Sequence, residues 1–152
     1  MSKLKIYTKS ILIPILIGII IGILISGSMN YESLVKPPLA PPAFLFPIVW
    51  AILYTLMGIS DGILTANSLK DAKTNFIYYL QLFVNALWPI AFFLLKWRFF
   101  AFLWIILLAV LIIWMIREFY KKNKLSAYLQ IPYLLWTLFA TYLNLGIWWL
   151  NR

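Results

Sequence analysis

One stretch of this sequence combines a stiff loop with an aromatic helix face. Residues 36–42, which we call the proline loop, include four prolines, and prolines break helices and favour extended backbone. After the loop, Trp50, Tyr54, Met57 and Asp61 recur at the three- or four-residue spacing of one helix face. Aromatic faces hold flat apolar molecules by stacking. The pattern predicts either the lid and wall of a binding site, or a membrane-entry loop followed by interfacial aromatic residues.

Two further segments carry polar and aromatic side chains at helical spacing. Asn85 and Trp88 lie three residues apart, and Pro132, Trp136 and Ala140 lie four residues apart. An amide inside an apolar helix is unfavourable in lipid, so Asn85 is expected to face the interior of a helix bundle. There it makes either an interhelical hydrogen bond or a ligand contact. Ala140 either leaves space in a cavity or lets two helices pack closely.

Side chains suited to conventional catalysis or metal binding are scarce. The chain has no cysteine and no histidine, which removes thiolate chemistry and the commonest general base and haem ligand. The only acid inside an apolar segment is Asp61, which is expected to be partly exposed near the headgroups, with Asp61-Gly62 closing its helix. The sequence therefore predicts no metal site and no conventional acid–base site. The four acids are far apart along the chain: Glu32, Asp61, Asp71 and Glu118.

The composition indicates an integral membrane protein. Of the 152 residues, 64% are hydrophobic and only 11% are charged, whereas about a quarter are charged in a typical soluble domain. The mean hydropathy is +0.94. The net charge of +9 would suit nucleic acid, but the basic residues lie in the breaks between apolar runs, where they serve as topology signals. We therefore expect no nucleic-acid binding and a single membrane domain covering residues 1–152.

Five apolar segments are long enough to cross a membrane, which takes roughly 20 residues. Backbone groups in lipid must be hydrogen-bonded internally, so the fold class predicted is all-α, a bundle of five transmembrane helices. Pro89 is expected to kink the third helix. The first segment also resembles a signal peptide, which leaves cleavage as an alternative. The predicted spans are about 10–29, 43–64, 76–95, 99–119 and 127–150.

The distribution of basic residues predicts the orientation. Nine lie on the N-terminal side of the predicted membrane and four on the other side. The positive-inside rule then places the N-terminus in the cytoplasm, with the proline loop and the C-terminus outside. A bacterial cytoplasmic membrane is the expected location. The nine are Lys3, Lys5, Lys9, Lys70, Lys73, Arg117, Lys121, Lys122 and Lys124, and the four are Lys36, Lys96, Arg98 and Arg152.

Over its whole length the chain resembles the translocator protein family, also called tryptophan-rich sensory proteins or peripheral benzodiazepine receptors. Several long motifs occur in the family's order. They are Tyr31-x-x-Leu34-x-Lys36-Pro37-x-x-x-Pro41-Pro42, Phe46-Pro47-x-x-Trp50-x-x-Leu53-Tyr54-x-x-Met57-Gly58, Asn85-Ala86-Leu87-Trp88 and Pro132-Tyr133-x-x-Trp136-x-x-Phe139-Ala140-Thr141-x-x-Asn144.

The resemblance implies a five-helix bundle, often dimeric, with a pocket that the loop before the second span closes. Family pockets bind porphyrins such as protoporphyrin IX and, in some members, benzodiazepine- or isoquinoline-type ligands, and roles in transport or stress sensing follow. No cofactor is required. Without histidine to ligate haem iron, a metal-free porphyrin is favoured. Carried over to this sequence, the pocket residues are Tyr31, Pro41, Trp50, Tyr54, Asn85, Trp88, Trp136 and Ala140.

The resemblance leaves alternatives to simple binding. Some family members break down protoporphyrin in light, with tryptophans matching Trp50 and Trp136 as the catalytic residues. A transporter is a further alternative, although no internal repeat is visible, and a purely structural subunit is the last. Cholesterol recognition is not expected, because residues 145–152 lack the tyrosine of the cholesterol motif. Other departures from the family pattern bear on ligand specificity and are Asn30, Leu39, Pro89 and Trp104.

Overall fold

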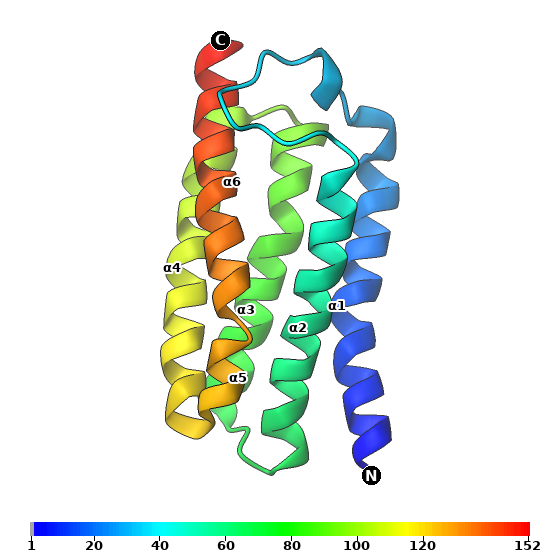
Figure 1. Cartoon of the computed structure of the whole chain (residues 1–152), viewed down its shortest axis with the longest axis vertical. Coiled ribbons are helices and arrows are strands. Elements are labelled where there is room, and N and C mark those ends of the chain that lie inside the picture. The colour runs from blue at the N-terminus through cyan, green and yellow to red at the C-terminus, as the bar shows by residue number, and fades with distance from the viewer. Residues whose placement is uncertain (1) are drawn as a thin grey trace.

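The computed structural model describes residues 2–152, which form helices and connecting segments and contain no strand. The long helices run side by side, and the N- and C-termini lie at opposite ends of the bundle (Figure 1). Long helices with apolar faces bury those faces only by packing on one another, so a bundle is the expected result. The helices are α1 (Lys3–Ile25), α2 (Leu45–Ala66), α3 (Ala72–Pro89), α4 (Arg98–Lys122), the short α5 (Lys124–Tyr128) and α6 (Ile131–Leu150).

Apolar side chains cover the outside of the bundle as well as its core. Ile23, for example, is 70% exposed on α1, which suits contact with lipid rather than water. Within residues 2–152, four helical stretches are long and apolar enough to cross a membrane: Lys3–Ser28, Leu45–Ala66, Ala72–Leu94 and Arg98–Lys122. The predicted all-α membrane protein is consistent with these features. Because α6 is not among the four, the predicted count of five spans stays a prediction.

The predicted boundaries need correction at both ends of the chain. Helix α1 begins at Lys3 rather than near residue 10, because the Ser2 side chain caps it by accepting the Lys5 N–H at 3.3 Å. The last segment is not one helix over 127–150 but two, α5 and α6. Pro132 lies in the first turn of α6, where its ring and missing N–H prevent an unbroken helix from α5.

Helix α3 departs from α-helical geometry at Pro89, where the sequence predicts a kink. A π-helical turn, η3 (Ile90–Leu94), follows it, with the Leu95 N–H donating to the Ile90 carbonyl at 2.9 Å. Proline has no backbone N–H to donate, and its ring disturbs the preceding turn of the helix. The wider turn that follows is where the helix adjusts to this disturbance. Such turns are frequent at functional sites.

Glycines on α2 allow α1 to pack directly against it. A Cβ added at Gly58 would lie 2.4 Å from the Ile11 Cα and 2.6 Å from the Ser10 carbonyl oxygen, and neither backbone atom can move aside without moving α1. Gly62 faces the Tyr7 ring in the same way, 2.7 Å from its Cδ1. The α1–α2 contact therefore depends on residues without a side chain.

Replacing Gly58 by alanine is expected to destabilise the protein, because α1 must shift outward to clear the new methyl group. Overpacking of this kind lowers the free energy of unfolding by about 1–3 kcal/mol. Gly22→Ala is the matched control, since a Cβ there has no neighbour within 4 Å. Thermal unfolding followed by tryptophan fluorescence measures both, and equal midpoints for the two variants would contradict the packing argument.

Asp61 is buried, which corrects the expectation of partial exposure. Its side chain pairs with Lys70, and the Lys70 ammonium also lies 5.3 Å from the centre of the Tyr78 ring. The residue is 3% exposed, and α2 continues beyond Asp61-Gly62 to Ala66. The partner lysine compensates the carboxylate for part of the solvation that it loses on burial, and the aromatic ring stabilises the lysine ammonium.

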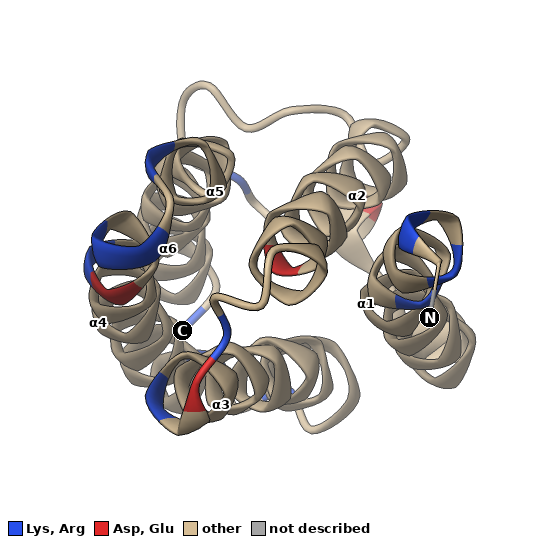
Figure 2. Cartoon of the chain, turned by 90° about the horizontal axis from the view of Figure 1, so that it is seen from below, with Lys and Arg blue, Asp and Glu red and all other residues tan. Residues whose placement is uncertain are grey.

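Acidic side chains pair with lysines at the end of the bundle that holds the N-terminus, where blue and red segments gather in Figure 2. Asp71 caps α3 by accepting the Thr74 N–H at 2.8 Å and also binds Lys122 of α4 at 2.8 Å. The hydrogen bond from Lys122, followed by those from Thr74, lowers the pKa of Asp71 well below its usual value. The ion pairs among residues 2–152 are Lys70–Asp61, Lys121–Glu118 and Lys122–Asp71.

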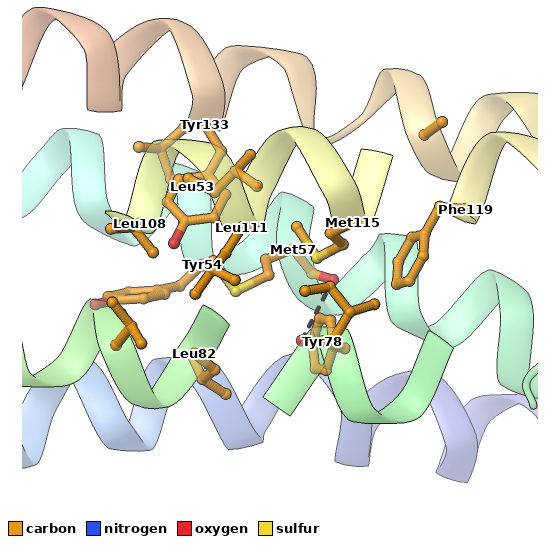
Figure 3. Close-up of a cluster of buried hydrophobic side chains, with 14 of the residues drawn as sticks. Leu53, Tyr54, Met57, Tyr78, Leu82, Leu108, Leu111, Met115, Phe119 and Tyr133 are labelled. Atoms are coloured by element: carbon orange, nitrogen blue, oxygen red, sulfur yellow. Dashed lines mark hydrogen bonds between the residues drawn. The ribbon is translucent and has the colours of Figure 1, made fainter. Parts of the chain in front are cut away.

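The hydrophobic core fills the half of the bundle nearer that end. In Figure 3, Tyr54 and Tyr133 lie toward one end of this cluster, and Tyr78 and Phe119 lie toward the other. Tyr78 stacks on Phe119 with ring centres 6.2 Å apart. Since the core is filled here, the open space of the bundle is left on the opposite side of Tyr54, toward the proline loop.

Candidate functional site

A cavity of about 370 Å³ lies among α1, α2, α3 and α6 on the proline-loop side of the core. No charged side chain lines it among the residues that the structure describes. Aromatic and aliphatic side chains form its walls, and the polar atoms come from a few tyrosine, tryptophan and asparagine side chains. The lining is Ile15, Gly18, Ile19, Ile21, Gly22, Ile25, Met29, Tyr31, Phe46, Pro47, Trp50, Ala51, Tyr54, Asn85, Trp88, Pro89, Phe92, Phe93, Ala140, Leu143, Asn144 and Ile147.

Six of the eight pocket residues predicted from the sequence line this cavity, and Pro41 and Trp136 do not. The Pro41 carbonyl accepts a hydrogen bond from the Tyr31 hydroxyl at 2.6 Å, so it holds a lining side chain in place. Trp136 packs edge to face on Phe46, with ring centres 5.8 Å apart. Both residues therefore lie one side chain behind the cavity wall. The six are Tyr31, Trp50, Tyr54, Asn85, Trp88 and Ala140.

Asn85 joins three helices at the inner end of the cavity. Its Oδ1 accepts from the Tyr54 hydroxyl at 2.7 Å, and its Nδ2 donates to the Tyr133 hydroxyl at 2.7 Å. The Tyr133 hydroxyl in turn donates to Gln81 Oε1 at 2.8 Å. The interhelical hydrogen bond that the sequence left as one alternative is present, and the same amide also lines the cavity.

A second polar pair lies at the outer end. Trp88 Nε1 donates to Asn144 Oδ1 at 2.9 Å, and Asn144 Nδ2 donates to the Arg98 carbonyl at 2.8 Å. Trp88 also stacks on Phe92 with ring centres 5.2 Å apart. These contacts fix the plane of the Trp88 ring, so the cavity presents a rigid aromatic surface.

Sequence reasoning did not assign several residues that shape this site. Gln81 lies one helical turn before Asn85, so their shared face was a usable signal. Phe46 lines the cavity beside the predicted aromatic positions. Gly18 also lines the cavity, and a Cβ there would lie 2.5 Å from the Tyr54 ring. Because Gly18 has no side chain, the Tyr54 ring can pack directly against α1 at this point.

The proline loop crosses the end of the bundle and contacts α6 (Figure 1). The Tyr142 hydroxyl donates to the Pro38 carbonyl at 2.6 Å. Asn151 pairs with the backbone of Val35, its Oδ1 accepting at 3.0 Å and its Nδ2 donating at 2.7 Å. Leu39, a departure from the family pattern, has a positive φ of 70° and is 83% exposed, so it points away from the cavity. Tyr142 and Asn151 therefore hold this segment against the C-terminal end of α6, at the end of the bundle nearer the cavity.

Removing these contacts is expected to speed ligand release. The double variant Tyr142→Phe/Asn151→Ala deletes three hydrogen bonds to the backbone of Pro38 in the loop and of Val35 directly before it, each with a net stabilisation of about 1 kcal/mol. The rate constant for dissociation of a ligand from the cavity should rise about tenfold or more if the loop must open for release. Stopped-flow fluorescence measures it, with the exposed Tyr120→Phe as the control at the other end of the bundle. A dissociation rate equal to that of the unaltered protein would show that the loop does not gate the cavity.

The electrostatics of the site come from two cations behind its aromatic wall. Lys36 Nζ lies 4.8 Å from the centre of the Tyr31 ring, and the Arg98 guanidinium lies 5.4 Å from that of Phe92. Within residues 2–152 no three His, Cys, Asp or Glu side chains gather in a way that would hold a metal ion. The arrangement is suited to stacking and hydrogen bonding with a flat, largely apolar molecule.

Comparison with known proteins identifies the family. The model of the TspO/MBR family matches residues 10–150. Tryptophan-rich protein TspO of Chlorobaculum tepidum is 35% identical over 127 residues, covering 82% of this chain and 80% of that protein. Its namesake in Bacillus cereus is 34% identical over 146 residues, covering 95% and 88%. Translocator protein of Ovis aries is 30% identical over 126 residues, covering 80% and 75%. With motifs, cavity and relatives in agreement, this chain belongs to the TspO/MBR family.

Proposed function

We propose that this protein binds a tetrapyrrole of the protoporphyrin IX type in the cavity beneath the proline loop. The observation that supports this most is the composition of the wall, in which Trp50, Tyr54 and Trp88 present aromatic rings around an uncharged space. A flat macrocycle stacks on such rings, and the Asn85 amide can bond to its polar edge. Lys36, behind the wall beside the Tyr31 ring, attracts the acidic side groups of the ligand.

The same cavity is proposed to accept synthetic benzodiazepine- and isoquinoline-type ligands, which are also flat and apolar. Relatives carry the names translocator protein and tryptophan-rich sensory protein. Transport and stress sensing are the roles that we propose for tetrapyrrole binding, and flux into proteoliposomes separates them.

In the membrane, we propose that α6 is the fifth span. It has 20 residues, about the length needed to cross the hydrocarbon layer. The termini lie at opposite ends of the bundle, as an odd number of spans requires (Figure 1). The basic residues then favour a cytoplasmic N-terminus in a bacterial cytoplasmic membrane. A homodimer is proposed from the family resemblance.

The proposal is tested by titrating the purified protein with protoporphyrin IX in the dark and following tryptophan fluorescence. Trp50 lines the cavity and Trp136 lies behind it, so Trp50→Phe should weaken binding more than Trp136→Phe. The loss for Trp50→Phe should be at most about fivefold, since a stacked pair contributes about 1 kcal/mol beyond buried area. Trp149→Phe, at an exposed tryptophan, is the control. Quenching that does not saturate, or that is equal in all three variants, would refute the cavity as the binding site.

Light-dependent breakdown of the bound porphyrin is the second candidate function. Its specific support is that the Trp50 ring lines the cavity and lies 5.5 Å from that of Tyr54 and 6.3 Å from that of Tyr133. An excited porphyrin with dioxygen as oxidant would have an indole at contact distance. Illumination of the complex tests it: an enzyme yields a discrete product that depends on Trp50, whereas a binder returns the porphyrin as it was or bleaches it equally in Trp50→Phe.

A further inference from the structure

A second, shallow cavity of about 310 Å³ lies at the end of the bundle opposite the N-terminus, where α4 begins and α6 ends. Three basic side chains line it, Lys96, Arg98 and Arg152, and no acidic one does. Only four basic residues lie on this side of the molecule, so three of the four converge on one site. We call it the basic cavity.

These three cations lack ionic partners, unlike the lysines at the other end. Each ion pair among residues 2–152 involves Lys70, Lys121 or Lys122. The fourth cation on the basic-cavity side, Lys36, is bound by backbone carbonyls, including those of Tyr31 and Leu34 at 3.0 Å each. Arg152 also donates to the Trp149 carbonyl at 3.2 Å and lies 3.6 Å from the centre of the Trp149 ring, but neither contact neutralises its charge. The convergence of unpaired charges is unfavourable without a counter-ion, and the positive-inside rule gives no reason for cations on this side.

Arg98 provides the clearest sign of a missing partner. Its Nε is buried and makes no hydrogen bond, while its Nη2 lies 3.5 Å from Asn30 Oδ1. A buried donor without an acceptor is destabilising, so the contacts of Arg98 within the protein leave its charge only partly satisfied. Arginine matches phosphate especially well, because its planar fork donates two parallel hydrogen bonds.

The position of the basic cavity indicates where the anion comes from. It lies between the first turn of α4 and the last turn of α6, at the depth where a helix leaves the hydrocarbon. Trp97 and Trp148 line it beside the cations, as expected at the level of the headgroups. Phe99 and Phe100 are about half exposed next to it and can contact acyl chains. Basic pockets between membrane helices bind acidic lipid headgroups.

We propose that the basic cavity binds the phosphate headgroup of an anionic phospholipid in the leaflet that contains the proline loop. The lipid phosphate pairs with Lys96, Arg98 and Arg152, and its chains lie along the outside of α4. Because Asn144 of the tetrapyrrole cavity is bonded to the Arg98 backbone, the lipid site and the ligand site share one structural element. The inference does not rest on the proposed function, since it concerns a different cavity.

The test uses the full-length protein in a mild non-ionic detergent. Dioctanoyl phosphatidylglycerol, dioctanoyl phosphatidylcholine and inorganic phosphate are titrated separately, with thermal unfolding and native mass spectrometry as readouts. We expect phosphatidylglycerol to raise the unfolding midpoint and to bind about 100-fold more tightly than phosphatidylcholine, at about fivefold per basic residue. Equal effects of the two lipids would overturn the proposal, and equal protection by inorganic phosphate would reduce it to a free-anion site.

Substitutions of the basic residues test whether the preference for phosphatidylglycerol comes from the basic cavity. Lys96→Gln/Arg98→Gln/Arg152→Gln should lose the preference for phosphatidylglycerol. Lys96→Gln/Arg152→Gln should lose about 25-fold of it while keeping the half-buried Arg98. This double variant decides the test if the triple variant misfolds. Lys3→Gln/Lys5→Gln/Lys9→Gln removes as many exposed charges from the other end and should keep the preference. Unchanged lipid preference in the first two, or equal loss in the third, overturns the proposal.

Discussion

Replacing Ala140 by phenylalanine is expected to abolish tetrapyrrole binding while leaving the fold intact. Ala140 is 5% exposed and lines the cavity on the α6 side, where its methyl group leaves the open space that a ligand would occupy. A phenyl ring at this position enters the cavity rather than a filled core. The apparent dissociation constant for protoporphyrin IX should therefore rise about 100-fold or more, equivalent to about 3 kcal/mol.

Stability should change in the opposite direction from binding in this variant. Filling a cavity adds dispersion contacts and commonly raises the free energy of unfolding by about 0.5–2 kcal/mol. Leu138→Phe is the control, because it adds an aromatic ring to an exposed position of the same helix. Fluorescence titration and thermal unfolding check both quantities. If Ala140→Phe bound porphyrin at the affinity of the unaltered protein, the ligand would have to bind elsewhere.

Much of the helical architecture could be predicted because hydrophobicity and length decide whether a segment forms a membrane helix. The boundaries of the helices were harder to predict from the sequence, because they depend on single contacts. The start of α1 depends on a cap by Ser2, and the break between α5 and α6 depends on the position of Pro132 within its turn. Asp61 was misplaced for a different reason. Its partner Lys70 lies beyond the end of α2, and only the turn into α3 brings the two together.

For the site, too, the types of residue could be predicted from the sequence, whereas the contacts between distant residues could not. Aromatic residues at helical spacing indicated a cavity wall, and most of the predicted positions do line one cavity. Pro41 and Trp136 lie behind it because Tyr31 and Phe46 come between them and the open space. Contacts of the proline loop with Tyr142 and Asn151 join residues more than a hundred positions apart, and spacing within one helix contains no information about such pairs.

Asn85→Leu is expected to weaken both the fold and ligand binding, and the two effects can be separated. Leucine removes the acceptor of the Tyr54 hydroxyl and the donor to the Tyr133 hydroxyl. Tyr133 keeps Gln81 as an acceptor, so the main loss is a buried Tyr54 hydroxyl without a partner. That loss costs about 1–3 kcal/mol in water-soluble proteins, and about 0.6 kcal/mol is typical of interhelical hydrogen bonds in membranes. We therefore expect the free energy of unfolding to fall by about 1 kcal/mol.

The double variant Asn85→Leu/Tyr54→Phe decides whether Asn85 also contacts the ligand. Removing both partners of a hydrogen bond is nearly neutral for stability, so the unfolding midpoint should return toward that of the unaltered protein. An asparagine amide has two N–H donors and two acceptor lone pairs, and Asn85 uses one of each within the protein, which leaves one of each for a ligand. Porphyrin binding should therefore remain about tenfold weaker in the double variant than in Tyr54→Phe alone, the loss expected for one hydrogen bond. Recovery of binding together with stability would mean that Asn85 only joins the helices, and that the aromatic wall alone selects the ligand.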